Sequence, residues 1–279
     1  QDKSGFSVDS LSGLFLYGPK AAYLKKFFLK LPNSTLQDEL AITYPSLDAV
    51  AENPALLGLH ANIDNSNISL KDILMVAPFL KAYPAITNFA SSIVKLKAKL
   101  EGKVGDLNIP TLVVSGLGNT SLKASGHLLG LPDPDKTYID LQLTDLQTTA
   151  ADITKLMPAG VMPAGYKLPA TMQASGNFKG TISEFNTQLA LKTSEGGASF
   201  KGAIDMRHPD LETYQGDLTA HNLDIGKMMG MQDMLGKLSL QTSLKGKSFN
   251  PKKASLALKG VINHLDFKGY AYQNLNFKA

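Results

Sequence analysis

The chain has 279 residues, and its 28 Lys and Arg against 24 Asp and Glu leave a formal net charge of +4. This small excess is not gathered into a basic cluster, so it does not indicate a nucleic-acid-binding protein. The hydrophobic content of 43% is too high for a disordered chain. The absence of cysteine excludes disulfides, cysteine-ligated zinc and thiol nucleophiles, and it fits an oxidising compartment such as a bacterial periplasm.

Targeting signals are missing from the sequence. It contains no run of roughly 18 apolar residues, which a membrane-spanning helix requires. It opens at Gln1 without the pattern of a signal peptide. We therefore expect an internal or processed piece of a larger protein, with any membrane anchor outside these residues.

The N-terminal third of the chain predicts strands followed by a short helix. Alternation of apolar and polar residues predicts strands over Phe6–Leu11, Leu36–Tyr44 and Leu57–Ile63, and a helix at 70–77. The apolar residues of Ala21–Leu31 also have helical spacing. The repeat described below favours a strand there.

Three later segments alternate in the same way and reach a glycine near their ends, at Gly102, Gly180 and Gly246. Period-two alternation predicts strands with one dry and one wet face. We expect the glycines to form the turns that end these strands. The dry positions that we select as candidate groove-lining residues are Val94, Leu96, Ala98, Leu100, Met172, Ala174, Phe178, Leu238, Leu240 and Leu244.

A short helical motif recurs between the strand blocks. Asp152 begins Asp-Ile-Thr-Lys-Leu-Met, and Asp224 begins Asp-Ile-Gly-Lys-Met-Met; Asp72 begins a degenerate copy. The three aspartates are 80 and 72 residues apart. An aspartate suits the N-terminal cap and dipole of a helix, while Pro78 and Pro158 would stop its continuation. The repeating unit is therefore four or five strands plus one short helix.

These repeats predict both the domain organisation and the fold class. We expect a partial first unit over 1–90, a second unit over 91–158, a third over 159–232 and a truncated fourth over 233–279. Repeats of this kind stack on their neighbours, and their short turns favour antiparallel pairing. The predicted fold is mainly β: an elongated, repetitive antiparallel sheet curled into an open groove, with short amphipathic helices between repeats.

The helices decide whether the dry face can be covered. A helix of two turns covers about 10 Å, whereas four or five strands span roughly 20 Å. The helices are therefore too short to cover the face unless the sheet curls. Two interpretations stay open: an apolar groove for an acyl chain, and a closed sandwich core without a ligand.

The combined order of motifs resembles a known family. Strands and glycine turns are followed by a Pro-Asp loop (Leu131–Asp133 and His208–Asp210), a tyrosine-containing strand and the Asp-Ile-x-Lys motif. This order resembles the AsmA-like superfamily and, within it, the TamB-like translocation and assembly module proteins of Bacteroidetes-type bacteria. The resemblance covers essentially the whole chain, as an internal fragment.

The resemblance implies a long periplasmic protein that an N-terminal helix, outside this fragment, anchors in the inner membrane. It implies an apolar trough reaching towards the outer membrane, with phospholipid acyl chains as ligands. It also implies a role in assembling outer-membrane proteins with a barrel partner. Contact with that barrel partner would fall on parts of the protein outside this fragment.

Motifs for catalysis or cofactor binding are not found. The five histidines lack metal-ligand spacing, and His127 and His221 are interpreted as ordinary strand residues. Asp133–Asp135 predicts a proline turn and Asp64–Asn67 an Asx turn rather than calcium loops. Ser115–Gly118 predicts a turn or bulge rather than a dinucleotide site. We expect a non-enzymatic protein without metal or cofactor.

Three functions remain open. The first is a periplasmic bridge segment for phospholipid transfer between the two membranes. The second is a scaffold or chaperone whose edge strands pair with outer-membrane client proteins. The third, a carbohydrate-active or adhesive β-repeat protein, ranks last because it would need an aromatic platform, and the chain has no Trp and only 8% aromatic residues.

Overall fold

The computed structural model describes residues 7–76, 81, 84–157, 162, 165–250 and 252–279. Strands account for 63% of the residues and helices for 12%, so the predicted mainly-β class is confirmed. The chain divides into two compact units, residues 1–158 (unit 1) and 159–279 (unit 2). The finer division into four repeats stays a prediction.

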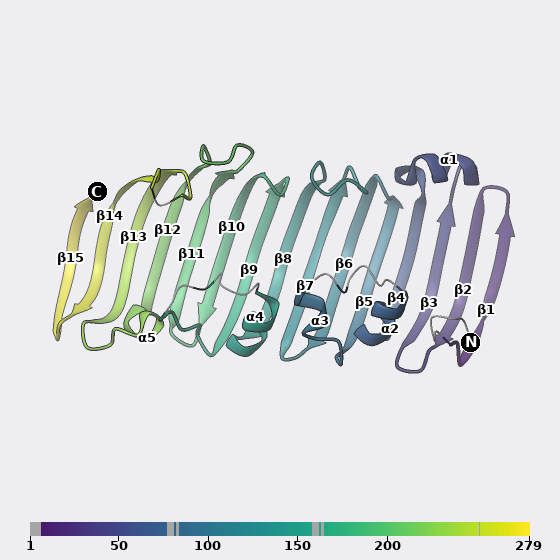
Figure 1. Ribbon diagram of the computed structural model, residues 1–279, viewed down its shortest axis with the longest axis horizontal. Coiled ribbons are helices and arrows are strands. Elements are labelled where there is room, and N and C mark those ends of the chain that lie inside the picture. The colour runs from purple at the N-terminus through teal and green to yellow at the C-terminus, as the bar shows by residue number, and fades with distance from the viewer. Residues whose placement is uncertain (1–6, 77–80, 82–83, 158–161, 163–164, 251) are drawn as a thin grey trace. The chain divides into compact units, whose positions relative to one another are not determined.

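Unit 1 contains an open antiparallel sheet in which each strand pairs with its neighbours in the chain (Figure 1). Among the described residues of this unit, β1 and β8 do not pair with each other. The strands are β1 (Ser10–Gly18), β2 (Ala21–Lys30), β3 (Thr35–Thr43), β4 (Gly58–Ser69), β5 (Ile93–Lys103), β6 (Asp106–Leu117), β7 (Thr120–Leu129) and β8 (Tyr138–Thr149).

Unit 2 contains a second run of antiparallel strands, again paired in chain order. The strands are β9 (Thr171–Gly180), β10 (Glu184–Thr193), β11 (Gly196–Asp205), β12 (Thr213–Asp224), β13 (Leu235–Lys247), β14 (Ser255–Phe267) and β15 (Tyr270–Lys278). The strand predicted at Ala21–Leu31 and the three glycine-containing strands are confirmed as β2, β5, β9 and β13.

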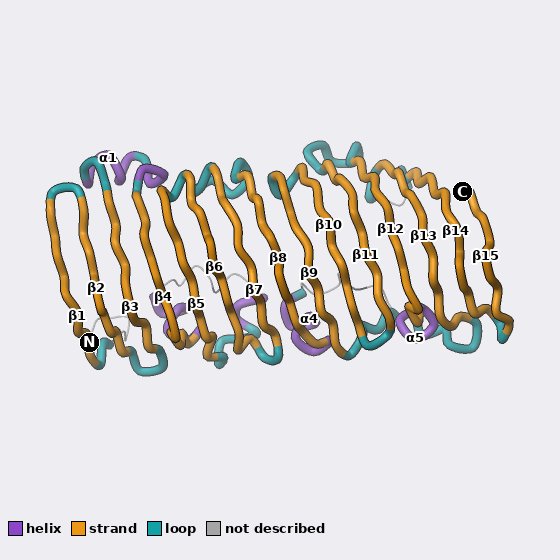
Figure 2. The backbone as a smooth tube through the Cα atoms, turned by 180° about the vertical axis from the view of Figure 1, so that it is seen from behind, coloured by secondary structure: helices purple, strands orange, loops and turns teal. Residues whose placement is uncertain are grey.

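Short helices interrupt the strands at regular intervals (Figure 2). A helix directly follows β4, β8 and β12, so the helix recurs after every fourth strand, within the four or five expected. The three predicted helices are confirmed to within two residues of their bounds. The helices are α1 (Leu47–Glu52), η1 (Pro54–Leu56), α2 (Leu70–Val76), α3 (Pro84–Thr87), α4 (Ala150–Leu156) and α5 (Ile225–Met229).

All three aspartates lie at a helix start, as predicted, but Asp224 alone of the three is an N-terminal cap. Its carboxylate caps α5 by accepting the backbone N–H of Lys227 at 2.9 Å. Asp72 and Asp152 instead lie within the first turns of α2 and α4, and both are buried. The cap of α4 is Thr149. Pro78 and Pro158, the predicted stops, lie outside the described residues.

The N-terminal strand was misplaced by the sequence prediction. Phe6 lies outside the described residues, and β1 begins at Ser10, near the end of the predicted strand. The alternation fails here because Leu14, Phe15, Leu16 and Tyr17 are consecutive and place apolar side chains on both faces of β1. A strand exposed on both sides has no single dry face to mark its limits.

The predicted Asx turn at Asp64–Asn67 is also wrong, because β4 runs through it. The ladder is irregular between Ile63 and Ser66, and Asn65 has a φ of 53°. Side chains replace part of the ladder: Asp38 accepts the Asp64 N–H at 2.6 Å, and the fully buried Ser66 hydroxyl accepts the Gln37 N–H. A polar sequence therefore continues as a bulged strand.

Glycines predicted as strand-ending turns lie inside strands in two cases. Gly102 pairs with Leu107 across β5 and β6, and Gly246 pairs with Tyr214 across β12 and β13. Gly180 is the last residue of β9, as expected. Ser115–Gly118 forms the predicted bulge and turn between β6 and β7.

Candidate functional site

The register of unit 2 aligns its apolar side chains into rows across the sheet, and we call the side that carries them the apolar face of unit 2. Each row passes through directly paired residues of neighbouring strands. At about 4.8 Å per strand, a row that crosses seven strands is about 29 Å long. One such row is formed by Ala174, Leu191, Ala198, Ala220, Leu240, Ile262 and Leu275.

The apolar face of unit 2 is only partly shielded from solvent. Among the described hydrophobic residues of this unit, Ala220 alone is buried. Leu189 and Leu191 of β10 are 41% and 37% exposed, and Leu275 of β15 is 41% exposed. The described strands contact their sheet neighbours and short helices, with no second sheet over them. The closed-sandwich interpretation therefore does not hold for the described part of unit 2.

Aromatic rings lie over glycines on the same face. The Phe200 ring covers Gly202 and Gly216, and the Tyr214 ring covers Gly246 so closely that an added Cβ would meet ring atoms. The Phe178 and Phe185 rings stack 4.5 Å apart. These glycines therefore recur because a flat ring needs a neighbour without a side chain.

The apolar face of unit 1 is built by the same alternation, although each of its strand pairs contains a register shift, and helices cover one end of it. Leu70 of α2 and Phe89 pack with Val94 of β5 in a buried cluster, joined by Leu156 of α4 and Val114 of β6. The helices thus bury the apolar face near the strand ends from which they continue. Further along β5, Leu96 and Leu100 are half-buried.

All ten predicted lining residues lie on the apolar face of their own unit. Of these, Val94 and Ala98 are buried, and the other eight are half-buried. Their role in lining a lipid groove stays a prediction. Further residues of the apolar face show the same alternation but were not predicted, namely Leu189, Leu191, Phe200, Leu218, Leu258 and Ile262.

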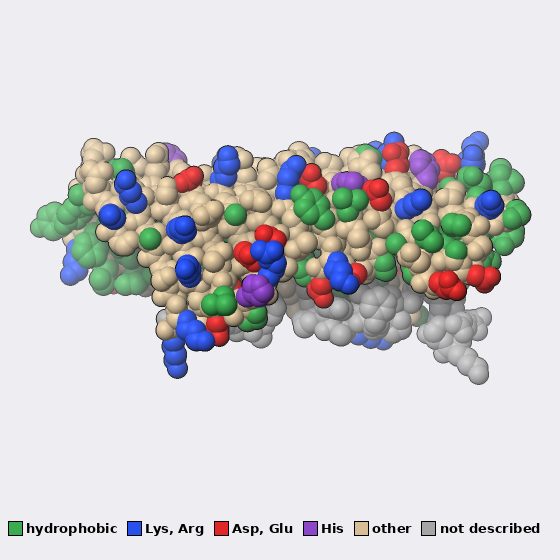
Figure 3. Space-filling model, turned by 90° about the horizontal axis from the view of Figure 1, so that it is seen from above, with side chains coloured by type: hydrophobic (Ala, Val, Ile, Leu, Met, Phe, Trp, Pro, Cys, Tyr) green, Lys and Arg blue, Asp and Glu red, His purple; other side chains and the backbone are tan. Residues whose placement is uncertain are grey.

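The opposite, polar face of unit 1 carries paired charges. Lys97 forms an ion pair with Asp64, with Nζ 2.9 Å from Oδ2, and Lys99 forms one with Glu101, with Nζ 2.8 Å from Oε1. Hydrogen bonding to Lys99 lowers the pKa of Glu101. His127, one of the two strand histidines, lies 2.6 Å from Asp106 across β6 and β7. Lys97 and Lys99 on this face are therefore each paired with a carboxylate. Figure 3, which looks onto the strand ends, shows cations and anions interspersed there.

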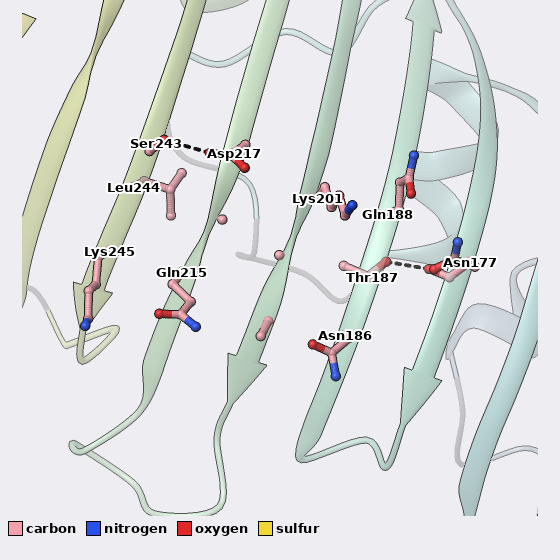
Figure 4. Close-up of a pocket in the computed structure, with 13 residues that line it drawn as sticks. Asn177, Asn186, Thr187, Gln188, Lys201, Gln215, Asp217, Ser243, Leu244 and Lys245 are labelled. Carbon is pink, nitrogen blue, oxygen red and sulfur yellow. Dashed lines mark hydrogen bonds between the residues drawn. The ribbon is translucent and has the colours of Figure 1, made fainter.

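The polar face of unit 2 contains a hollow of about 530 Å³ over β9 to β13 (Figure 4). Its walls are mostly carboxamide and lysine side chains from neighbouring strands. The lining side chains include Asn186, Gln188, Lys201, Gln215, Asp217 and Lys245.

The described residues do not contain a metal centre. No group of three or more His, Cys, Asp or Glu there could hold a metal ion. The His221 ring is hydrogen-bonded to Asn222 at 3.2 Å. None of the helices that the structure describes has the length and apolarity needed to cross a membrane.

Comparisons with protein-family models, curated proteins and solved structures gave no significant match to this chain. The resemblance to the AsmA-like superfamily therefore depends on the sequence motifs alone.

Proposed function

We propose that this chain is a non-enzymatic module that holds phospholipid acyl chains on its apolar faces. The observation that carries the proposal is the partly exposed apolar face of unit 2, where a row of apolar residues crosses every strand and Leu189 and Leu191 remain exposed. Exposed apolar residues that are neighbours on one face mark interaction sites more often than scattered ones do.

The energetics favour a flexible apolar ligand. Each methylene group removed from water contributes about 0.8 kcal/mol, so half-burial of a chain of about sixteen carbons contributes roughly 6 kcal/mol. Rows of half-buried side chains offer contacts along the whole length of an extended chain, without a hydrogen-bonding requirement. The polar headgroup would remain in solvent.

The cellular role that we propose follows the family resemblance. The chain would be a periplasmic segment of an inner-membrane-anchored protein of the TamB-like type, and it would transfer phospholipid towards the outer membrane. The cysteine-free composition and the repeated strand-and-helix unit support this proposal.

A charge placed on the apolar face tests the proposal. We expect phospholipid to co-purify with the chain in native mass spectrometry, and a fluorescent fatty acid to bind. Leu189→Glu should weaken fatty-acid binding at least about tenfold, because it replaces apolar contact by a charge. Ala190→Glu is the matched control, since its side chain is on the polar face of the same strand. The proposal is wrong if no lipid is bound and both variants behave alike.

A second proposed function is the scaffolding of client β-strands, and the apolar composition of β1 is compatible with strand pairing. Leu11, Phe15 and Tyr17 are 62%, 64% and 65% exposed, and β1 contains no charged residue that would discourage pairing. The hydrophobic side chains gathered at this end are visible on the right of Figure 3. The same variants separate the two functions, because scaffolding through β1 does not depend on Leu189.

A further inference from the structure

The hollow on the polar face of unit 2 is built on regular sheet. The ten consecutive residue pairs of β10 and β11, and the nine of β11 and β12, contain no register shift. Directly paired residues place Asn186, Ala203, Gln215 and Lys245 in one row. The short Ala203 side chain lies between two carboxamides and leaves room above the floor.

A second row runs alongside the first. It places Gln188, Lys201 and Asp217 on β10, β11 and β12, each two residues along its strand from the first row. Because all of these side chains leave hydrogen-bonded strands, their backbone positions are fixed before any ligand arrives. Figure 4 shows the side chains of both rows standing on neighbouring strands of the sheet.

The polar groups of this hollow are largely unused within the protein. Asp217 accepts a hydrogen bond from Ser243 at 2.7 Å. In the part of the chain that the structure describes, the carboxamides of Gln188 and Gln215 and the ammonium groups of Lys201 and Lys245 have no hydrogen-bond or ion-pair partner. On the polar face of unit 1, by contrast, lysines are paired with carboxylates at 2.8–2.9 Å.

The chemistry of these groups defines a ligand class. Carboxamides both donate and accept hydrogen bonds, which suits hydroxyl groups, and lysines bind phosphate as point charges. Two lysines against one carboxylate leave the walls positive. We propose that this hollow binds a hydroxyl-rich anion of the sugar-phosphate class. A volume of about 530 Å³ lies within the range of small-molecule sites.

Titration of the full chain with three probes tests this site, followed by amide chemical shifts or calorimetry. Glucose 6-phosphate should bind at least about tenfold more tightly than glucose or inorganic phosphate, because it alone uses both the carboxamides and the lysines. Lys201→Gln and Lys245→Gln should each weaken its binding about five- to tenfold. Lys192→Gln is the matched control, an exposed lysine on the polar face of β10 outside the hollow.

The possible outcomes are distinct. Equal binding of phosphate and glucose 6-phosphate would mean that charge alone is recognised, and it would overturn the proposal. Absence of binding, or an equal loss in Lys192→Gln, would overturn it as well. Circular dichroism should be unchanged in all three variants, since each altered side chain is exposed. Because the site lies on the polar face, these results do not depend on acyl binding.

Discussion

The two units share one strand pattern but differ in how they cover it. Eleven of the twelve buried hydrophobic residues in the described chain lie in unit 1, and unit 2 has only Ala220. Unit 1 also carries fifteen acidic residues against fourteen basic ones, whereas unit 2 has nine against fourteen. Alternation of apolar and polar residues thus creates an apolar face in both units, while the helices determine how much of that face is buried.

The helices of unit 1 are held by buried carboxylates. Asp152 of α4 is 3% exposed and accepts hydrogen bonds from the Asn119 N–H and the Thr149 hydroxyl, both at 2.9 Å. Asp72 of α2 makes the equivalent contact with the turn between β2 and β3, where the Ser34 hydroxyl donates to it at 2.6 Å. Each aspartate therefore ties a helix to a strand turn of the same repeat.

Unit 2 replaces this buried tie by an exposed ion pair. Lys227 of α5 contacts Glu195, in the turn between β10 and β11, at 3.1 Å, and its side chain is 56% exposed. Asp224, the last residue of β12, caps the helix with its carboxylate, and its backbone N–H donates to the Glu195 carbonyl in that turn at 2.7 Å. Solvent screening makes such a pair weak, so α5 should be held less firmly than α4.

The largest expected effect comes from removing the buried tie. Asp152→Ala should lower the free energy of unfolding of unit 1 by about 2–4 kcal/mol, because it leaves buried donors without an acceptor. Asp224→Ala, the corresponding variant of unit 2, should cost about 1 kcal/mol, the typical value of a helix cap. Urea unfolding, with hydrogen exchange to assign the loss to a unit, measures both. Equal losses would contradict the distinction between the two ties.

The sequence predicted the strand pattern well, but it did not predict the contacts of Asp72 and Asp152 with the strand turns. Period-two alternation identified β5, β9 and β13 because each has one dry face. The carboxylate contacts depend on residues such as Asn119 and Asp152, which are 33 positions apart. Their meeting is set by turn length and register, which local periodicity does not encode.

The polar hollow was not predictable for the same reason. Asn186, Gln215 and Lys245 form one row only because the loops between their strands fix the register. Nothing in the composition of any single strand distinguishes these residues from ordinary solvent-facing ones. The predicted turn at Asp64–Asn67 failed for a related reason, since Asp38 and Gln37 from another strand supply the missing hydrogen bonds.

A smaller effect is expected from filling the space under an aromatic ring. In Gly246→Val, the new side chain would collide with the Tyr214 ring, which stacks on Phe249 at 5.1 Å. We expect a loss of about 1–3 kcal/mol in unit 2 and a change in the near-ultraviolet dichroism of tyrosine. Gly18→Ala in β1 of unit 1 is the control, because its added Cβ has no neighbour closer than 3.8 Å. A loss in the control as large as in Gly246→Val would show that ring contact is not the cause.

The smallest effect concerns an exposed ion pair of unit 2. Hydrogen bonds from Arg207 to Asp205, including Nε to Oδ1 at 2.9 Å, lower the pKa of that carboxyl to about 2. Because this pKa is below the unfolded value of about 3.9, the pair stabilises the fold above that pH and loses its contribution as the pH falls from about 4 to about 2.

Arg207→Gln should therefore raise the pKa of Asp205 towards its ordinary value, measured by carboxyl NMR titration, and flatten the pH dependence of stability in that window. Lys99→Gln is the parallel change in unit 1, where Lys99 lowers the pKa of Glu101. It should shift the titration of Glu101 upwards and leave that of Asp205 unchanged. If Asp205 still titrates at about 2 without the guanidinium, the arginine is not the cause of the low pKa, and the charge excess of unit 2 would have to act through more distant lysines.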